Sequence, residues 1–374
     1  MAEQMLVTGG AGFVGSHLVD ELLRKGHRVR VLDALVPQVH GPRAKPPAYL
    51  AKDAEFLKGD VRDREMWRRA LKDVAVVFHD AAEVGVGQSM YEIARYVEAN
   101  VLGTALLLEA LISERGKVRK LIVASSMSIY GEGQYRCARC GPVAPSLRPE
   151  SQLAERRWDM QCQTCRASLE AAPTPESKPL MPTSVYAVTK RDQEELCLTV
   201  GRAYNIPAVA LRYFNIYGPR QSLSNPYTGV AAIFSSRLRN GKPPKIFEDG
   251  RQSRDFIHVR DIVLANLLAM ERAEADYDVF NVGTGTATSI AQVADALRQV
   301  LGAPTASEVT GQSRAGDIRH CYADITKIQQ RLGFRPTMSL RDGIADLVAW
   351  AQQAQAVDRV DQAFEELASR GLAK

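Results

Sequence analysis

The chain has 374 residues, of which 45% are hydrophobic and 24% charged, and its formal net charge is +5. This composition is typical of a globular protein with one large α/β domain and a smaller lobe, or with two domains. Its lysines and arginines are scattered along the sequence, so we expect no nucleic-acid binding. Without a basic leader, a cleavage site or an apolar run of membrane-spanning length, the sequence predicts a cytoplasmic protein that does not enter a membrane.

The chain opens with the pattern of a β-α-β unit. Residues 5–8 read as a buried strand, residues 9–25 as a glycine-rich turn with a helix, and residues 28–32 as a second strand that ends at Asp33. Asp33 is placed to accept hydrogen bonds from an adenosine ribose and would repel a 2′-phosphate, which favours NAD over NADP. Three glycines would let the turn approach a pyrophosphate closely. They are Gly9, Gly12 and Gly15.

Three further strands are expected in the first third of the chain. Together with the first two they would form a parallel sheet, which binds its ligands at the carboxyl ends of its strands. The strands are expected at residues 55–57, 74–78 and 121–124, the helices at about 89–98 and 101–115, and a proline-rich surface loop at 39–48.

Several residues that come after these strands are candidates for cofactor contacts. Asp60 either contacts the adenine amino group or caps the next helix. Ala81 and Ala82 are small enough to let a cofactor lie against the strand ends. His79, directly before them, reads as a structural histidine and not as a base.

Four of the six cysteines form two Cys-x-x-Cys pairs inside a segment at about residues 132–180. Paired knuckles of this kind hold a tetrahedral zinc through four thiolates, and they leave no open position for catalysis. We therefore expect a structural zinc site, which would supply the folding energy of a segment with few apolar residues. The alternative is four unrelated thiols. The expected ligands are Cys137, Cys140, Cys162 and Cys165.

A helix from about residue 183 to residue 204 carries the reactive group that we expect. Tyr186 and Lys190 are four residues apart and would share one face of this helix. A lysine ammonium beside a phenol favours the phenolate and would lower the tyrosine pKa toward neutrality. By itself the pair could equally be a half-buried aromatic residue and a solvated lysine.

The strict β-α alternation fades after a sixth strand at residues 208–214. The remaining sequence predicts a small C-terminal α/β lobe with short strands near residues 245–247 and 279–281, then a loosely packed polar amphipathic helix. The helices are expected at about residues 227–240, 259–271, 289–301 and 324–332. The predicted domains are residues 1–215 for NAD binding, 216–350 for substrate binding, and 351–374 as a helical tail.

Over residues 5–345, apart from the cysteine insertion, the sequence resembles the extended short-chain dehydrogenase/reductase family, in its nucleotide-sugar epimerase and dehydratase branch. The resemblance implies a Rossmann-type doubly wound parallel sheet and bound NAD. It also implies a homodimer in which the helices at 89–115 and 183–204 pair into a four-helix bundle. The motifs that carry it are the glycine turn at 9–15, Ser126, Tyr186-x3-Lys190, the segment 211–215 and the segment 254–259.

The resemblance also implies roles for individual residues. Tyr186 would take the proton of the sugar hydroxyl while hydride passes to NAD. Lys190 would hold the nicotinamide ribose, and Ser126 would bind the reacting oxygen. Arg254 and Arg314 would neutralise the sugar pyrophosphate, although each could be a surface ion pair. The remaining cofactor contacts would come from Phe13, Val14, Val61, Asn100 and Phe214, and the remaining substrate contacts from Val86, Met127, Asn215 and Phe247.

One pair of residues separates the branches of the family. Dehydratases carry Asp-Glu directly after the serine or threonine, whereas this chain has Met127 and Ser128, neither of which is an acid or base near neutral pH. Elimination therefore lacks its catalyst, and epimerisation at C4 remains. The segments 224–229 and 247–250, with the cysteine insertion, resemble those of dTDP-L-rhamnose 4-epimerases, which form dTDP-6-deoxy-L-talose.

Other functions stay open at this point. They are a UDP-sugar 4-epimerase, an NAD(P)-dependent nucleotide-sugar reductase or decarboxylase of the same fold, and a non-catalytic NAD-binding protein whose zinc module recruits a partner. The complete set of Ser126, Tyr186 and Lys190 argues against the last, because a sensor needs no base. Asp33 argues against NADPH, and Ser128 stands where sugar-acid decarboxylases carry a glutamate.

Overall fold

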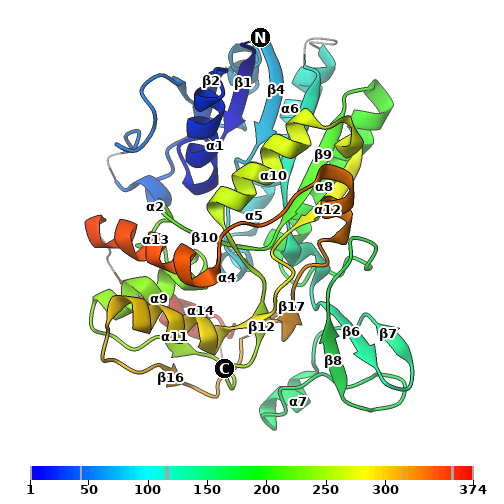
Figure 1. Ribbon diagram of the computed structural model, residues 1–374, viewed down its shortest axis with the longest axis vertical. Coiled ribbons are helices and arrows are strands. Elements are labelled where there is room, and N and C mark those ends of the chain that lie inside the picture. The colour runs from blue at the N-terminus through cyan, green and yellow to red at the C-terminus, as the bar shows by residue number, and fades with distance from the viewer. Residues whose placement is uncertain (1, 43, 114–117, 315, 355–357, 373–374) are drawn as a thin grey trace.

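A computed structural model describes residues 2–42, 44–113, 118–314, 316–354 and 358–372 (Figure 1). Its central layer is a seven-stranded parallel sheet in the order β3-β2-β1-β4-β5-β9-β14. The order of the strands reverses between β1 and β4, which is the arrangement of a Rossmann-type sheet, as predicted. The strands are β1 (Gln4–Thr8), β2 (Arg28–Asp33), β3 (Glu55–Lys58), β4 (Val74–His79), β5 (Lys120–Ser126), β9 (Ala208–Tyr213) and β14 (Asp278–Val282).

Helices cover both faces of this sheet because its strands are apolar on both sides. In β1, Met5 and Val7 point into one apolar core, and Leu6 points into the other. The first core is closed by α1 (Phe13–Arg24), α10 (Val259–Glu271) and α12 (Thr326–Leu332). The second is closed by α3 (Arg64–Ala70), α6 (Gly103–Ser113) and α8 (Val185–Tyr204).

The two helices expected at about 89–98 and 101–115 are not separated at residues 99 and 100. The chain stays helical there and changes its helix type. The helical stretch consists of α4 (Val86–Ser89), α5 (Ile93–Tyr96), the π-helix η1 (Val97–Leu102) and α6, and residues 114 and 115 lie outside the described part. By length and mean hydropathy, Ile93–Ser113 could cross a membrane, which corrects the expectation that no run is long enough. However, Leu107 and Leu111 of this stretch are buried in the second core, as in the core helix of a globular protein.

The C-terminal half alternates between the main sheet and a smaller lobe. Residues 279–281, expected in the lobe, belong to β14, which pairs with β9 at the edge of the main sheet. Hydrophobic side chains of Phe234, Val293 and Leu347 join the lobe helices into a separate core. The lobe contains α9 (Val230–Arg239), α11 (Ile290–Leu301), α13 (Leu340–Gln353), β10 (Asn215–Tyr217), β11 (Lys245–Ile246), β12 (Ser253–Arg254), β13 (Phe256–His258), β15 (Thr288–Ser289), β16 (Glu308–Val309) and β17 (His320–Cys321), and the 3-10 turn η3 (Ala273–Ala275) lies after α10.

The cysteine-rich segment forms a small antiparallel sheet that projects from the body at the lower right of Figure 1. Its own core is small and includes Tyr135, Met160 and Leu169 around the cysteines. Its elements are β6 (Gln134–Cys137), β7 (Gly141–Val143), α7 (Glu150–Ala154) and β8 (Leu169–Ala172).

Two further segments differ from expectation. The proline-rich loop contains a short helix, α2 (Pro37–His40), because a proline at the first helical position has a suitable φ and needs no amide partner. The C-terminal helix α14 (Val360–Ser369) is not loosely packed. Its Leu367 lies against Gly87, and its Glu366 accepts a hydrogen bond of 3.0 Å from the Tyr227 hydroxyl.

Candidate active site

The glycine-rich turn lies between β1 and α1 and leaves no room for side chains. A Cβ atom on Gly15 would lie 2.5 Å from the carbonyl oxygen of Gly9, and Gly9 has a φ of +68°. No side chain caps α1, so the amides of Phe13 and Val14 in its first turn are open toward this turn. An unobstructed helix N-terminus of this kind suits the pyrophosphate of a dinucleotide.

Asp33 lies at the end of β2, and its carboxylate faces the same turn. Its two oxygens accept hydrogen bonds from the amides of Ala11, at 3.0 Å, and Leu35, at 2.8 Å. The ring of His40 lies 3.6 Å away. Because a carboxylate can accept about four hydrogen bonds, these contacts leave capacity for a ribose hydroxyl.

The two residues expected after β3 have local partners. The carboxylate of Asp60 pairs with Arg62 at 2.7 Å, and the helix cap that was the alternative for Asp60 is provided by Asp63. The carbonyl of Val61 accepts a bond of 2.7 Å from the indole of Trp67. The contact of Asp60 with adenine and that of Val61 with the cofactor remain predictions.

The end of β4 lies directly beside the glycine turn. A Cβ atom on Gly9 would be 3.0 Å from the backbone of Ala81, so the two loops are in contact, with Ala82 next along the chain. His79 is buried and bonded to Thr8 at 2.9 Å and to Thr104 at 3.0 Å. Burial lowers its pKa to about 3, so it stays neutral, as expected of a structural histidine.

Asp80 was not predicted as a site residue from the sequence, although it comes directly after a strand. Both of its carboxylate oxygens are buried and have no hydrogen-bond partner among the described residues. Burial raises its pKa to about 7, and Lys190 partly opposes this shift. An orphaned carboxyl at the edge where cofactor and base are expected marks this position as part of the site.

Asn100 connects the β4 loop to the helix that carries the expected base. Its amide group donates to Thr189 at 3.0 Å and to the carbonyl of Glu83 at 3.1 Å, and its oxygen accepts from the Glu83 amide at 2.7 Å. It lies in the π-helix η1, a helix type that is frequent at functional sites.

The start of α8 is fixed by local bonds that place Tyr186 in its first turn. Ser184 caps the helix by accepting from the amide of Ala187 at 3.1 Å. The amide of Tyr186 donates to the hydroxyl of Ser89 at 3.0 Å, which ties α8 to α4. One turn later, the ammonium of Lys190 donates to the carbonyl of Ala124 in β5 at 2.8 Å.

Ser126 ends β5, and its side chain lies near enough to Tyr186 to lower the pKa of the phenol. The side-chain oxygen of Ser126 accepts from the hydroxyl of Ser128 at 2.9 Å. Next to it, Ser125 donates to Glu194 at 2.6 Å, and Glu194 forms a buried ion pair with Arg212. This network joins α8 to β5 and β9 and holds the serine against the tyrosine.

The pKa values differ from the expectation for Tyr186. Burial raises its pKa to about 12, and the hydrogen bond from Ser126 lowers it only in part. Lys190 does not contribute to this shift, and its ammonium donates a hydrogen bond of 2.8 Å to the carbonyl of Ala124. Burial also lowers the pKa of Lys190 to about 8. In the chain alone, desolvation therefore dominates the pKa values of both groups.

Two of the expected substrate residues lie where chain segments from β9 and the lobe meet. The side-chain oxygen of Asn215 is buried without a partner among the described residues. Arg254 donates to the carbonyls of Ser253, Ile318 and Arg319 at 2.8, 2.7 and 3.2 Å, and it forms no ion pair with a described carboxylate. Its positive charge is thus held in place but not neutralised, which suits an anionic ligand.

Arg314 and Phe247 lie together in the lobe. The guanidinium of Arg314 lies 4.5 Å from the centre of the Phe247 ring and pairs with Asp317 at 2.9 Å. For Arg314 the alternative to pyrophosphate binding was a surface ion pair, and this contact with Asp317 is such a pair. On its other side the Phe247 ring lies 5.9 Å from that of Phe364 in α14.

The last three predicted residues have different surroundings. Met127 begins the 3-10 turn η2 (Met127–Tyr130) and is buried, as is Phe214, whose ring lies 6.4 Å from that of Tyr130. Val86 begins α4 and is 43% exposed. The expected contacts of these three residues with cofactor and sugar therefore remain predictions.

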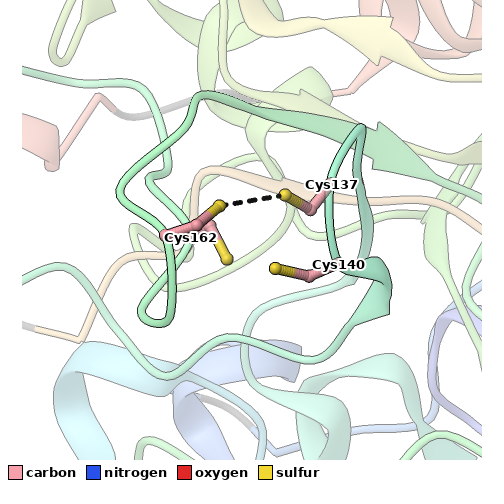
Figure 2. A group of neighbouring side chains, drawn as sticks. Cys137, Cys140 and Cys162 are labelled. Carbon is pink, nitrogen blue, oxygen red and sulfur yellow. Dashed lines mark hydrogen bonds between the residues drawn. The ribbon is translucent and has the colours of Figure 1, made fainter.

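The four cysteines come together in the projecting sheet. Their sulfur atoms all lie within 4.8 Å of one another, and Figure 2 shows those of Cys137, Cys140 and Cys162 turned toward a common centre. Tetrahedral zinc with bonds of about 2.3 Å would space its sulfurs at about 3.8 Å, so the arrangement fits such an ion. Backbone amides of Cys165 and Thr164 lower the pKa of Cys162 to about 6, which favours a thiolate.

A family model for the NAD dependent epimerase/dehydratase family matches residues 5–149 and 162–283. The chain belongs to this family. Between the two matched stretches, residues 150–161 are unmatched, and they lie inside the cysteine-rich insertion.

Relatives and solved structures agree with this membership. A dTDP-L-rhamnose 4-epimerase of Burkholderia thailandensis is 37% identical over 96% of this chain and 96% of its own length. The UDP-glucose 4-epimerase of Thermotoga maritima, solved with UDP-glucose, has a TM-score of 0.77 and 33% identity, and covers 94% of this chain and 99% of its own. A Bacillus cereus UDP-glucuronic acid 4-epimerase, solved with UDP-glucuronic acid and NAD, has a TM-score of 0.76 and 28% identity, with the same coverage.

Proposed function

We propose that this chain is an NAD-dependent nucleotide-sugar 4-epimerase that interconverts dTDP-L-rhamnose and dTDP-6-deoxy-L-talose. The observation that carries the proposal is the meeting of Ser126, Tyr186 and Lys190 at the carboxyl edge of the main sheet, beside the glycine turn. The choice of sugar rests on the identity with the Burkholderia thailandensis enzyme.

In this proposal the main sheet holds the cofactor. The turn from Gly9 to Gly15 and the first amides of α1 would hold its pyrophosphate, and Asp33 would hold the adenosine ribose. When bound, NAD supplies a hydride acceptor and a positive charge. The additional positive charge, with Lys190 bonded to the nicotinamide ribose, would lower the high pKa of Tyr186.

The residues of the chain then act on the sugar hydroxyl at C4. Ser126 would orient that oxygen by a hydrogen bond, and Tyr186 would accept its proton as the hydroxyl is oxidised to a ketone. Reduction of the ketone from its opposite face, with the proton returned by Tyr186, would invert C4. Elimination has no catalyst here, because Met127 and Ser128 come directly after the serine.

The lobe would hold the nucleotide end of the substrate. Arg254 carries an unneutralised positive charge and would bind the pyrophosphate, with Arg314 joining it once released from Asp317. The side-chain oxygen of Asn215 and the ring of Phe247 would complete this end. In terms of domains, we assign cofactor binding to residues 1–215 and substrate binding to 216–350, excepting the stretch 259–282 that returns to the main sheet, with 351–374 as a tail.

Two structural features belong to the same proposal. The four cysteines would bind one zinc ion that stabilises the insertion, as their spacing supports. The chain would form a homodimer through the surfaces of α5, η1, α8 and the end of α4, where apolar side chains are exposed. These side chains are Met90, Ile93, Val97, Leu102 and Val188.

A UDP-sugar 4-epimerase is the second candidate, because the Thermotoga maritima and Bacillus cereus structures were solved with UDP-sugars. Purified protein should be incubated with dTDP-L-rhamnose, and separately with UDP-glucose, without added cofactor, and the products monitored by NMR. We expect only dTDP-L-rhamnose to give its C4 epimer. Conversion of UDP-glucose alone would favour the second candidate, and conversion of neither would contradict 4-epimerisation of these sugars.

The mechanism predicts a specific result for Tyr186→Phe. The variant lacks the group that accepts the C4 proton, so turnover should fall by at least about 1,000-fold, within the range found for general acid–base groups. Bound NAD, measured after denaturation of the protein, should stay at the wild-type level. Activity similar to wild type in this variant would exclude Tyr186 as the base.

A further inference from the structure

A buried cluster of charges lies between the cysteine-rich insertion and the C-terminal lobe. The guanidinium of Arg148, from the insertion, donates to both carboxylate oxygens of Glu248 at 2.9 and 2.7 Å, and each side chain is only 2% exposed. Arg319 donates to the same carboxylate at 3.0 Å. Two arginines from different parts of the chain thus share one buried carboxylate.

Glu248 has an unusual backbone that these contacts hold in place. Its φ of +53° lies in the left-handed region, which residues other than glycine seldom adopt. Its amide also donates to the carbonyl of Gln312 at 2.8 Å. Backbone strain of this kind persists only where surrounding contacts enforce it, and it is concentrated at functional sites.

The segments joined by this cluster carry the residues expected to bind the nucleotide sugar. Glu248 is the next residue after Phe247, and the amide of Gly250 closes the turn on the Phe247 carbonyl at 3.3 Å. Arg148 also reaches the carbonyl of Asp317 at 3.3 Å. The next two carbonyls, of residues 318 and 319, are the ones that orient Arg254.

The insertion contacts this second segment at two more points. Asp159 pairs with Arg319 at 2.9 Å. Glu132, at the beginning of the insertion, accepts the backbone amides of Arg319 and His320 at 2.8 and 2.7 Å. The hydroxyl of Tyr135 in β6 holds that glutamate at 2.6 Å. The orientation of the insertion therefore fixes the path of the chain beneath Arg254.

Stability alone does not account for such a cluster. A buried ion pair is often no more stabilising than apolar residues of similar volume, because both charges lose their hydration. What a bidentate arginine–carboxylate contact adds is a defined geometry. The charged cluster therefore serves to hold three parts of the chain at fixed distances from one another. These parts are the insertion, the 247–250 turn and the 317–320 segment.

We propose that the cysteine-rich insertion positions the nucleotide-sugar-binding segments of this enzyme, and that Arg148 and Glu248 are the positioning residues. They act through Phe247 and Arg254 and do not contact the reacting atoms. The inference rests on the proposed function, since it assigns a role within that binding site.

The first test replaces Arg148 by methionine in the full-length protein. Arg148→Met should raise KM for the sugar nucleotide about tenfold, while kcat stays within about twofold, because misplaced binding groups weaken binding without removing the base. The content of bound NAD should be unchanged. The matched control is Arg157→Met, which removes an exposed ion pair with Glu155 on the same insertion and should leave KM unchanged.

A second variant separates positioning from folding. Arg148→Met combined with Glu248→Met leaves no unpaired charge, because Arg319 keeps Asp249 and Asp159 as partners. Its melting temperature should recover toward that of the wild type, whereas KM should stay raised about tenfold. If the double variant has the KM of the wild type, the cluster only stabilises the fold and the proposal is wrong.

The binding of dTDP and of UDP, measured by calorimetry on the same proteins, distinguishes this proposal from the proposed function. If wild-type protein binds a nucleoside diphosphate and epimerises neither sugar, the proposed reaction fails, but the comparison of affinities still tests positioning. Weaker diphosphate binding by both Arg148 variants supports the proposal. Unchanged affinity in both overturns it, and so does a wild-type protein that binds neither diphosphate.

Discussion

At the scale of single residues, burial decides the chemistry of the site more than charge pairing does. Tyr186 and Lys190 are both withdrawn from water, and burial moves the pKa of the phenol up to about 12 and that of the ammonium down to about 8. Each shift favours the neutral form, as expected when desolvation dominates. If Tyr186 is the base, as proposed, it needs a further positive charge such as that of the cofactor for its activation.

The lowered pKa of Lys190 gives a pH dependence that can be measured on cofactor-free protein. The ammonium expected to bind the nicotinamide ribose is present below about pH 8 and is lost above it, with Asp80 and Cys197 opposing the loss. The affinity for NAD should therefore fall as the pH rises through about 8, and calorimetry across this range measures it. Lys190→Met should bind NAD more weakly and show a smaller fall.

A pH-independent affinity of the wild type would contradict this role for Lys190. The ammonium would then either stay charged throughout or make no contact with the cofactor. Lys242→Met serves as the control, because this exposed lysine is paired with Asp358 and Asp361 far along the chain from the glycine turn.

At the scale of elements, the insertion is a unit whose apolar core is small compared with its size. Five buried residues, two of them cysteines, form this core, so the four sulfurs must contribute to its stability. Zinc bound by four thiolates can contribute on the order of 10 kcal/mol in small modules. Loss of the proposed zinc ion should therefore disturb both the insertion and the loops that it contacts.

Cys140→Ser tests this coupling, because Cys140 is exposed and the substitution removes little besides its sulfur. Elemental analysis should find about one zinc ion per wild-type chain and markedly less in the variant. Limited proteolysis should then cut the variant within residues 134–172, while bound NAD is retained. Thr164→Ala, an exposed change in the second knuckle, is the control and should behave as the wild type. Full zinc content in Cys140→Ser would contradict a four-thiolate site.

At the scale of the whole molecule, one surface is apolar without being covered in the single chain. Ile93 and Val97 are 51% and 41% exposed, and Val188 of the neighbouring helix α8 is 43% exposed. Residues spaced three and four apart line one side of a helix, so they form a continuous stripe. Burial of such a stripe contributes about 25 cal/mol per Å² of apolar area, which favours association of two copies.

Val97→Glu should therefore convert a dimer into a monomer, because a charge would be buried in the centre of the interface. Light scattering coupled to size-exclusion chromatography measures the mass directly. Val309→Glu, at an exposed position of β16 in the lobe, is the control and should leave the mass unchanged. A wild-type mass of one chain, or a dimeric Val97→Glu variant, would exclude this interface.

The local features of the protein could be predicted from its amino-acid sequence. The strands and helices of the first β-α-β unit lie where their apolar runs and glycines predicted them, and so does the helix that carries Tyr186. The four cysteines lie together as their spacing predicted. Such features depend on neighbours in the sequence, on helix periodicity and on turn residues, so a pattern in the chain is sufficient to predict them.

Features that depend on segments far apart in the sequence became visible in the folded structure. The strand at 279–281 was expected in the lobe but lies at the edge of the main sheet, since strand pairing depends on partners far away in the chain. The fold brought Arg148 against Glu248, and it buried Tyr186 and Lys190 enough for desolvation to determine their pKa values. Strand pairing, the burial of side chains and the energy of buried charges depend on contacts between distant parts of the chain. A local sequence pattern does not specify those contacts.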